Sequence, residues 1–172
     1  MSGPSRRLFI GLLPDDAARR ALVDQQQRWH WGSGGVPTPQ ARLHLTLHFL
    51  GEVDATCEHA LRAALAAEDV APFELVLRTP ECWSGGIAVL RADAHAALID
   101  LRARLAARLL QAGIAPMRDG FVPHLTVARG AVHAAPPEAV APIVWTVRDF
   151  ALVWSRARPP ARYEVLERYG SS

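Results

Sequence analysis

The sequence of 172 residues predicts an α+β fold with a mixed, largely antiparallel sheet and helices packed on its outer faces. The first observation is the order of the hydrophobic patterns, which runs strand, helix, strand, helix, two strands, helix and then several strands. This order has neither the alternating βαβ units with a Gly-rich phosphate loop nor the tandem short repeats of other classes. The second observation is that two segments alternate apolar and polar residues, which is typical of strands with one buried face.

The composition is that of an ordinary globular protein long enough to bury a substantial core. No apolar run approaches the roughly 18 residues of a membrane span, and the N-terminus lacks a signal-peptide pattern, so we expect no membrane association. All 19 basic residues are arginine. The arginine fork suits phosphate, so the composition permits a nucleic-acid ligand without arguing for one. Cys57 and Cys82 are too few for a disulfide framework, and we expect free thiols in a reducing cytoplasm.

Four elements are expected in the first half of the chain. The apolar run "RLFIGLL" reads as a buried strand that Pro14 ends. Aspartates that precede apolar, helix-periodic residues read as N-caps, because their carboxylates accept hydrogen bonds from the first free N–H groups. The expected elements are a strand over 7–13, a helix from Asp15 or Asp16 to about Trp29, a strand over 42–51 and a helix that begins at Asp54.

The second half is expected to hold one long helix and several strands. Leucines at 98, 101, 105 and 109 form one apolar stripe of a helix over 93–111, and Gly113 stands where a C-terminal cap belongs. The segment "PECWSGG" reads as a turn-rich connection between two strands. The expected strands cover 73–78, 87–91, the second alternating segment, 143–154 and 162–167.

Two of these strands carry the same polar pattern. "RLHLTLHFLG" (42–51) and "FVPHLTVARG" (121–130) both contain His-apolar-Thr-apolar. Because side chains at i and i+2 share a face, each strand presents one His-Thr pair, His44 with Thr46 and His124 with Thr126. Leu43, Leu45, Leu47 and Phe49 are expected on the buried face of the first strand, with His48 on the polar face as a rim residue. Strict alternation puts Arg129 on the face opposite His124 unless the strand twists or bulges there.

Three interpretations of the doubled pattern compete. Exposed His and Thr are ordinary on a half-buried strand, but alternation alone does not select His followed by Thr twice. A metal site is disfavoured, because His44 and His48 on one strand lie roughly 13 Å apart and cannot share an ion. The third interpretation is acid–base catalysis by two histidines, whose pKa of about 6.5 makes one neutral and one protonated ring available near neutral pH.

In-line displacement at phosphorus needs a base on the side of the attacking water and an acid on the side of the leaving oxygen. Two imidazoles on facing strands supply both, and threonine hydroxyls can hydrogen-bond the non-bridging oxygens. A ribose 2′,3′-cyclic phosphate suits such a site, since its ester is strained and its leaving oxygen can be protonated.

On these motifs the sequence resembles the 2H phosphoesterase superfamily, and within it the bacterial and archaeal RNA 2′,3′-cyclic phosphodiesterases once named 2′-5′ RNA ligases. Five segments match in order over nearly the whole chain: "RLFIGLLP", "LHLTLHFLGEV", "PFELVL", "FVPHLTVAR" and "ARYEVLERY".

The resemblance implies one bilobal domain over residues 1–172, with two pseudo-symmetric lobes facing each other across a central cleft. It implies hydrolysis of terminal 2′,3′-cyclic phosphate on RNA to a 2′-phosphate, with His44 as proton donor and His124 as proton acceptor. Thr46, Thr126 and Arg129 would bind the substrate. We expect no metal, no cofactor and a monomer in the cytoplasm, with RNA or oligonucleotide ends as partners.

Two other functions stay open from the residues. One is ligation, in which the same site works in reverse and joins cyclic-phosphate ends to 5′-hydroxyl ends of RNA. The other is a module that has the same cleft and binds RNA ends or nucleotides without turnover. Phe9, Phe49 and Trp31 could stack on a base, although we expect core or loop packing for each.

Overall fold

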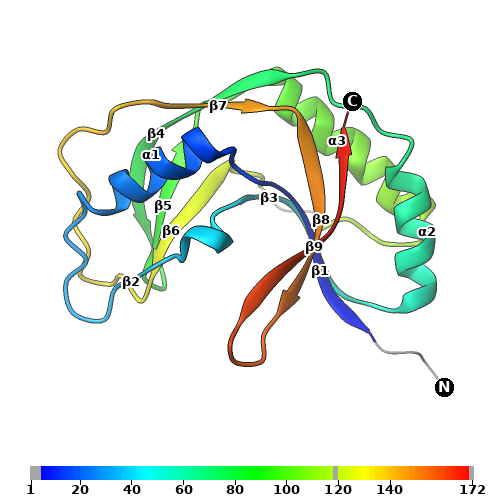
Figure 1. The fold of residues 1–172 in the computed structure, drawn as a ribbon, viewed down its shortest axis with the longest axis horizontal. Helices are drawn as coiled ribbons and strands as arrows, with labels where there is room; N and C mark the ends of the chain where they lie inside the picture. Colours follow the sequence, from blue (N-terminus) through cyan, green and yellow to red (C-terminus); the bar gives the residue numbers. More distant parts are fainter. Residues whose placement is uncertain (1–4, 118–119, 171–172) are drawn as a thin grey trace.

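The structure is a computed structural model that describes residues 5–117 and 120–170, and its strands form one curled antiparallel sheet (Figure 1). The sheet follows the order β7-β4-β5-β6-β3-β1-β8-β9, and β2 pairs with β6 beside this path. The strands are β1 (Arg6–Leu12), β2 (Val36–Pro37), β3 (Leu45–Val53), β4 (Phe73–Trp83), β5 (Ile87–Ala92), β6 (His124–Arg129), β7 (Ile143–Val147), β8 (Asp149–Arg156) and β9 (Arg162–Gly170). The helices are α1 (Asp16–Gln26), α2 (Ala55–Leu65) and α3 (Ala96–Gln111), with a short 3₁₀ turn over Gln40–Arg42.

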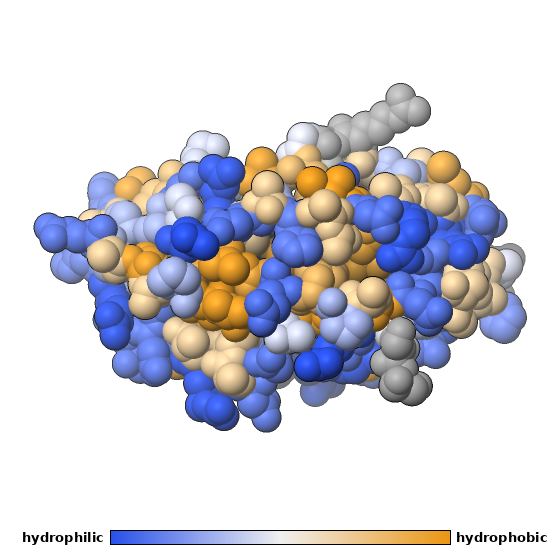
Figure 2. Space-filling view, turned by 90° about the horizontal axis from the view of Figure 1, so that it is seen from above, coloured by the Kyte–Doolittle hydropathy of each residue, from blue (hydrophilic) through white to orange (hydrophobic). Residues whose placement is uncertain are grey.

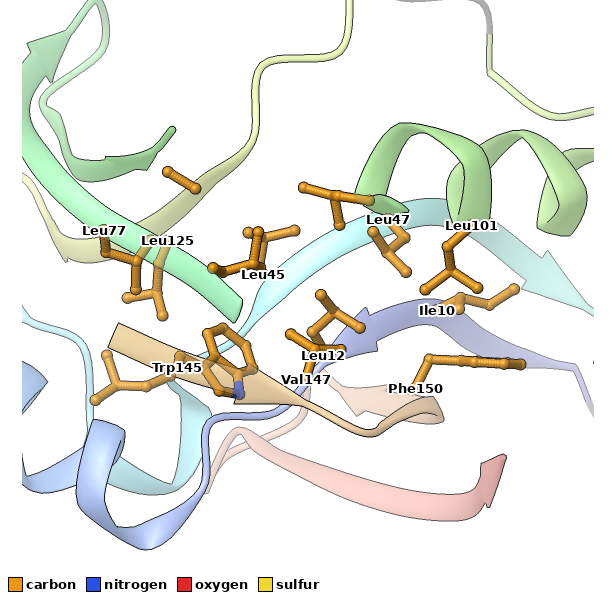
Figure 3. Close-up of a cluster of buried hydrophobic side chains, with 14 of the residues drawn as sticks. Ile10, Leu12, Leu45, Leu47, Leu77, Leu101, Leu125, Trp145, Val147 and Phe150 are labelled. Atoms are coloured by element: carbon orange, nitrogen blue, oxygen red, sulfur yellow. The ribbon is translucent and has the colours of Figure 1, made fainter. Parts of the chain in front are cut away.

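The sheet consists of two halves that meet at its centre. One half is β7-β4-β5-β6 and the other is β3-β1-β8-β9. The pairing of β3 with β6 is confined to Leu45 opposite Leu125, both fully buried. These two leucines lie side by side in a core that continues from Leu77 in one half to Phe150 in the other (Figure 3). The apolar faces of the two His/Thr strands are therefore the point at which the halves are joined.

The helices cover the outer face of the sheet, and each half has its own (Figure 1). Helix α1 packs on β7, whereas α3 packs on β3 and on α2. The four leucines of the predicted stripe, at 98, 101, 105 and 109, are the buried residues of α3. The predicted α+β class, with a largely antiparallel sheet in two halves and helices on the outer faces, is confirmed.

Helix boundaries follow the capping side chains. Asp15 accepts a hydrogen bond from Ala18 N at 2.8 Å, and Asp54 accepts one from Cys57 N at 2.8 Å, as the sequence predicts. Helix α1 ends at Gln26, earlier than predicted. The N-cap of α3 is His95, whose Nδ1 accepts from Ala97 N at 3.1 Å, so the helix begins after Asp93 rather than at it.

Two expected strands differ from the prediction. Strand β4 continues through "PECW" to Trp83, and only Ser84–Gly86 form the turn. Pro80 fits inside the strand because β7 pairs only with Phe73–Leu77, which leaves the later part of β4 with a free edge. The expected strand over 143–154 is two strands, because the chain passes at Arg148 from pairing with β4 to pairing with β1.

The surface is mixed, with apolar side chains in small groups among hydrophilic ones on the face seen in Figure 2. Large exposed apolar residues are spread over several elements, among them Val36, Ile99, Leu110, Val132 and Val144. Among the described residues, no helix combines the length and the apolar character that a membrane span requires.

Truncation of the central pair should destabilise the whole protein. We expect Leu45→Ala to lower the free energy of unfolding by about 3 kcal/mol, because it leaves a cavity where the two halves meet. Val144→Ala on the edge strand β7, where the side chain is 53% exposed, should change it by less than about 0.5 kcal/mol. Urea unfolding followed by tryptophan fluorescence measures both, and equal losses would contradict the central role of the pair.

Candidate active site

The sequence-predicted site residues all line one cavity of about 310 Å³ on the face of the sheet opposite the helices. His44 directly precedes β3 and Thr46 lies near its start, whereas His124, Thr126 and Arg129 come from β6. The remaining lining residues are Arg7, Phe9, Phe49, Ser155 and Tyr163. The two motifs, about eighty positions apart in the sequence, thus share one cavity because β3 and β6 are neighbours in the sheet.

A β-bulge in β6 brings Arg129 into this cavity. Adjacent residues Ala88 and Val89 of β5 pair with Ala128 and Thr126, so Val127 is the extra residue. Val127 and Ala128 are consecutive and both fully buried, which reverses the alternation after the bulge. Arg129 therefore shares the open face with His124 and Thr126, where strict alternation would have turned it away.

The same bulge occurs at the matching place in β3. Ile10 and Gly11 of β1 pair with His48 and Thr46, which makes Leu47 the extra residue. His48 is consequently buried, at 4% exposure, and Phe49 turns to the cavity. The expectation that His48 lies on the rim and Phe49 in the core is wrong, because a one-residue insertion exchanges the two faces.

A helix side chain holds the carbonyl of each bulged residue. Arg102 of α3 donates its Nε to Leu47 O at 3.1 Å, and His48 Nε2 bonds the Arg102 carbonyl at 2.9 Å. In β6, buried Gln26 of α1 donates Nε2 to Val127 O at 2.7 Å and to Thr38 O at 3.0 Å. Leu47 O accepts from Arg102 of the helix behind it, and Val127 O accepts from Gln26 as well as from the backbone N–H of Thr38 at 2.8 Å.

Both catalytic candidates are fixed by their own strands. Nδ1 of His44 lies 2.7 Å from Arg42 O, and Nδ1 of His124 lies 2.7 Å from Val122 O. A carbonyl only accepts, so Nδ1–H donates in both rings and Nε2 is the nitrogen that can exchange a proton. Nε2 of His44 lies 2.9 Å from Thr46 Oγ1. The two imidazoles are thus prepared alike for proton transfer at Nε2.

The cavity is cationic and favours neutral imidazoles in the free protein. Burial lowers the pKa of His44 to about 4, aided by the positive charges of Arg42, His124 and Arg129. Burial also lowers the pKa of His124, with Arg129 contributing. No aspartate or glutamate is found among the described residues that line the cavity, so an anion would find complementary charge there. The described residues include no cluster of three or more His, Cys, Asp or Glu that could hold a metal ion.

Aromatic side chains surround the two histidines. The His44 ring lies 4.6 Å from the Phe9 ring and 5.1 Å from the Tyr163 ring, centroid to centroid, and the His124 ring lies 4.4 Å from the Trp83 ring. Phe9 and Phe49 therefore line the site, whereas Trp31 stacks on buried Trp29 instead.

Sequence reasoning missed Arg7, Trp83, Ser155 and Tyr163. Ser155 and Tyr163 face each other across β8 and β9, a pairing that local patterns do not reveal. Trp83 was hidden in the segment read as a turn. The sequence offered one signal for Tyr163, because it lies in "ARYEVLERY", the segment that resembles the closing strand of the 2H phosphoesterases.

Comparisons with known proteins identify the family of the chain. The family model described as "2'-5' RNA ligase superfamily" matches residues 14–165. The chain belongs to this superfamily. The RNA 2',3'-cyclic phosphodiesterase of Thermus thermophilus is 32% identical, covering 95% of this chain and 89% of the relative. The protein of the same name from Escherichia coli is 31% identical over 98% of both chains.

A solved structure of the superfamily shares the fold. The crystal structure of E. coli LigT in apo form matches with a TM-score of 0.82 and 27% identity, covering 97% of this chain and 99% of that one. The resemblance to 2H phosphoesterases drawn from the sequence is therefore confirmed.

Removal of the hydrogen bonds that Gln26 of α1 donates should lower the stability of the protein. We expect Gln26→Leu to lower the free energy of unfolding by about 1–3 kcal/mol, because the buried carbonyl of Val127 and the partly buried carbonyl of Thr38 lose their side-chain donor. Gln27→Leu, at the exposed neighbouring position, is the matched control and should have little effect. Chemical denaturation measures both variants, and equal stability of the two would show that the contact contributes nothing.

The buried histidine should titrate far below its usual range. We expect His44 to titrate near pH 4 in the free protein, so that its contribution to stability is complete above about pH 6.5 and is lost as the pH falls toward 4. Inorganic phosphate should raise the pKa of both histidines by placing negative charge beside them. NMR of the imidazole nitrogens measures this, with chloride at equal ionic strength as control. A His44 that titrates near pH 6.5 without phosphate would contradict the burial argument.

Proposed function

We propose that the protein is an RNA 2′,3′-cyclic phosphodiesterase that opens terminal cyclic phosphates to 2′-phosphates by two-histidine acid–base catalysis. The observation that carries this proposal is the pair of imidazoles with Nδ1 bound to backbone carbonyls and Nε2 directed to one cationic cavity. The curated relatives that carry the name RNA 2',3'-cyclic phosphodiesterase support the same reaction.

Two proton transfers divide the reaction between the motifs. His124 accepts a proton from water at Nε2 while the water oxygen attacks phosphorus. His44, protonated at Nε2, donates to the departing 3′ oxygen. In the free protein His44 is neutral near pH 7, so the negative charge of the bound phosphate raises its pKa and allows it to carry this proton. Activity falls at low pH, where both rings are protonated, and at high pH, where neither is.

The polar residues between the histidines bind the phosphate. Thr46 and Thr126 offer hydroxyls to the non-bridging oxygens, where charge grows during attack. Arg129 offers its guanidinium to the same oxygens, and among the described residues none forms an ion pair with it within 4.0 Å. These assignments rest on the shared cavity and on the chemistry of the side chains.

The ribose and base of the terminal nucleotide belong on the His44 side. The leaving 3′ oxygen stays attached to this ribose, and His44 protonates it, so the sugar lies near the rings that contact His44. Phe9 and Tyr163 form that wall and provide apolar surface for a ribose or base.

The proposal also covers the domain organisation, the oligomeric state, the location and the substrate class of the protein. We take residues 1–172 as one bilobal domain that works as a monomer in the cytoplasm on RNA or oligonucleotide ends. The acid–base scheme uses neither a metal nor a cofactor.

Removal of either imidazole should abolish turnover. We expect His44→Ala and His124→Ala each to lower kcat/KM for a cyclic-phosphate oligonucleotide by about 100-fold or more, with wild-type activity unchanged by EDTA. His59→Ala, at an exposed histidine of α2, is the matched control. Product analysis should find a 2′-phosphate. A 3′-phosphate product would overturn the donor and acceptor assignment, and tight binding without product would favour a binding module.

A further inference from the structure

A crevice of about 460 Å³ adjoins the cavity that holds the two histidines, and Tyr163 lines both. It lies where β9 contacts the 3₁₀ turn Gln40–Arg42, between α1 and the β8–β9 hairpin (Figure 1). The other residues that line the crevice are Leu13, Arg19, Gln40, Ala41, Val153, Val165 and Arg168. Its volume falls within the roughly 300–1,000 Å³ typical of small-molecule sites, so the crevice has room for one nucleotide.

The ring of Tyr163 is the wall between the histidine cavity and the crevice. The His44 ring meets it edge-on, with 5.1 Å between the two centroids. The Arg42 guanidinium carbon lies 4.8 Å from the centre of the same ring, which is the distance of a cation–π contact. Because this fixed ring borders both hollows, a chain that leaves the histidine cavity past Tyr163 enters the crevice.

Arg19 of α1 gives the crevice a positive charge that is held by carbonyl groups. Its NH2 donates to Pro14 O at 3.1 Å, and its NH1 donates to Gln40 O. Burial lowers the pKa of Arg19, the carboxylate of Asp16 opposes this effect, and the positive charge of Arg168 adds to it. Two cations that act on each other in a partly buried place favour an anion beside them.

The carboxylates near the two arginines lie on their other side. Arg168 donates NH1 to Asp149 at 3.1 Å, and half of its side-chain surface remains exposed. Asp149, Asp15 and Asp16 line the next hollow, which shares Arg19 and Arg168 with the crevice. Among the described residues that line the crevice itself there is no aspartate or glutamate. The crevice therefore presents guanidinium groups without a competing anion.

An RNA substrate would extend from the histidine cavity toward these arginines. In the proposed mechanism the terminal ribose lies on the His44 side, against Phe9 and Tyr163. The 5′ oxygen of this ribose carries the phosphate that links it to the preceding nucleotide. The arginine fork binds phosphate oxygens through parallel N–H groups. Apolar surface for the preceding nucleoside comes from Leu13, Val153 and Val165.

We propose that the crevice binds the nucleotide that precedes the cyclic phosphate in an RNA strand, with the linking phosphate at Arg19 and Arg168. The proposal rests on the proposed function, because it uses the position given there to the terminal ribose. The crevice then determines the preferred length of the substrate. A strand of two or more nucleotides occupies it, whereas a mononucleoside 2′,3′-cyclic phosphate does not reach it. Binding energy from this remote contact raises kcat/KM for the longer substrate.

Val165 allows a test in which only charge differs between two variants. Its side chain is 43% exposed, and it lines the crevice but not the histidine cavity. Val165→Glu places a carboxylate beside the expected phosphate, and Val165→Gln is the matched control of the same shape without charge. The substrates are a dinucleotide that ends in a 2′,3′-cyclic phosphate and the corresponding mononucleoside 2′,3′-cyclic phosphate.

The measured quantity is the ratio of kcat/KM for the dinucleotide to kcat/KM for the mononucleoside. In the wild-type protein this ratio should be about ten or more, as expected for a phosphate held by charged hydrogen bonds. Val165→Glu should lower the ratio about five-fold or more by repulsion of the phosphate. Val165→Gln should keep it within about two-fold, and hydrolysis of the mononucleoside substrate should stay within about two-fold in both variants.

A second pair of variants tests an arginine directly. Arg168→Gln should lower the ratio about three-fold or more, because the phosphate loses a guanidinium donor. Arg156→Gln is the matched control and should leave the ratio unchanged. Arg156 lies in the same hairpin, pairs with Glu164 at 3.5 Å and lines neither the crevice nor the histidine cavity.

Several results would overturn the proposal. One is a wild-type protein without preference for the dinucleotide, and another is a ratio that Val165→Glu leaves unchanged. An equal fall of the ratio in Val165→Gln would show that shape and not charge matters there. An equal loss for both substrates in Val165→Glu would place its effect in the histidine cavity. Absence of hydrolysis of either substrate by the wild-type protein would instead refute the proposed function itself.

Discussion

One extra residue in each of two central strands determines where the groups of the site point. Leu47 and Val127 are bulged, and after each of them the buried and open faces exchange. Without the bulges, Phe49 and Arg129 would lie on the buried face of the sheet and His48 would lie on the face of the cavity. The bulges therefore extend each open face from a His-Thr pair to a third residue, aromatic in one half and cationic in the other.

The helices behind the sheet support the site, because their side chains donate hydrogen bonds to the carbonyls of the bulged residues. Gln26 of α1 and Arg102 of α3 reach through to the carbonyls of Val127 and Leu47. In both halves, a helix side chain is thus hydrogen-bonded to the carbonyl of the bulged strand residue. The pairing of Leu45 with Leu125 places β3 beside β6, so that the His-Thr pairs of both strands line one cavity.

In the proposed mechanism, the charge of the cavity explains how a pair of equivalent histidines can take different roles. Burial and nearby arginines hold both imidazoles toward the neutral form, and the lowering of the pKa is large for His44. An anionic phosphate reverses the balance, because it adds negative charge where the described lining residues have none. The substrate itself then supplies the field that retains one proton on the pair.

The amino-acid pattern was sufficient for the fold class, the approximate position of most elements and the two His-Thr pairs, because hydrophobic periodicity, aspartate caps and strand alternation are local properties. It did not reveal that "PECW" is strand, that His48 is buried, or that Phe49 lines the cavity. Arg129 was assigned to the site by the family resemblance, whereas strict alternation placed it on the opposite face. Tyr163, Ser155 and Trp83 were equally hidden. Each of these depends on a bulge or on pairing between distant strands, where a one-residue shift in register exchanges the faces of the strand. That shift is decided by hydrogen bonds from helices remote in sequence, so only the folded chain defines it.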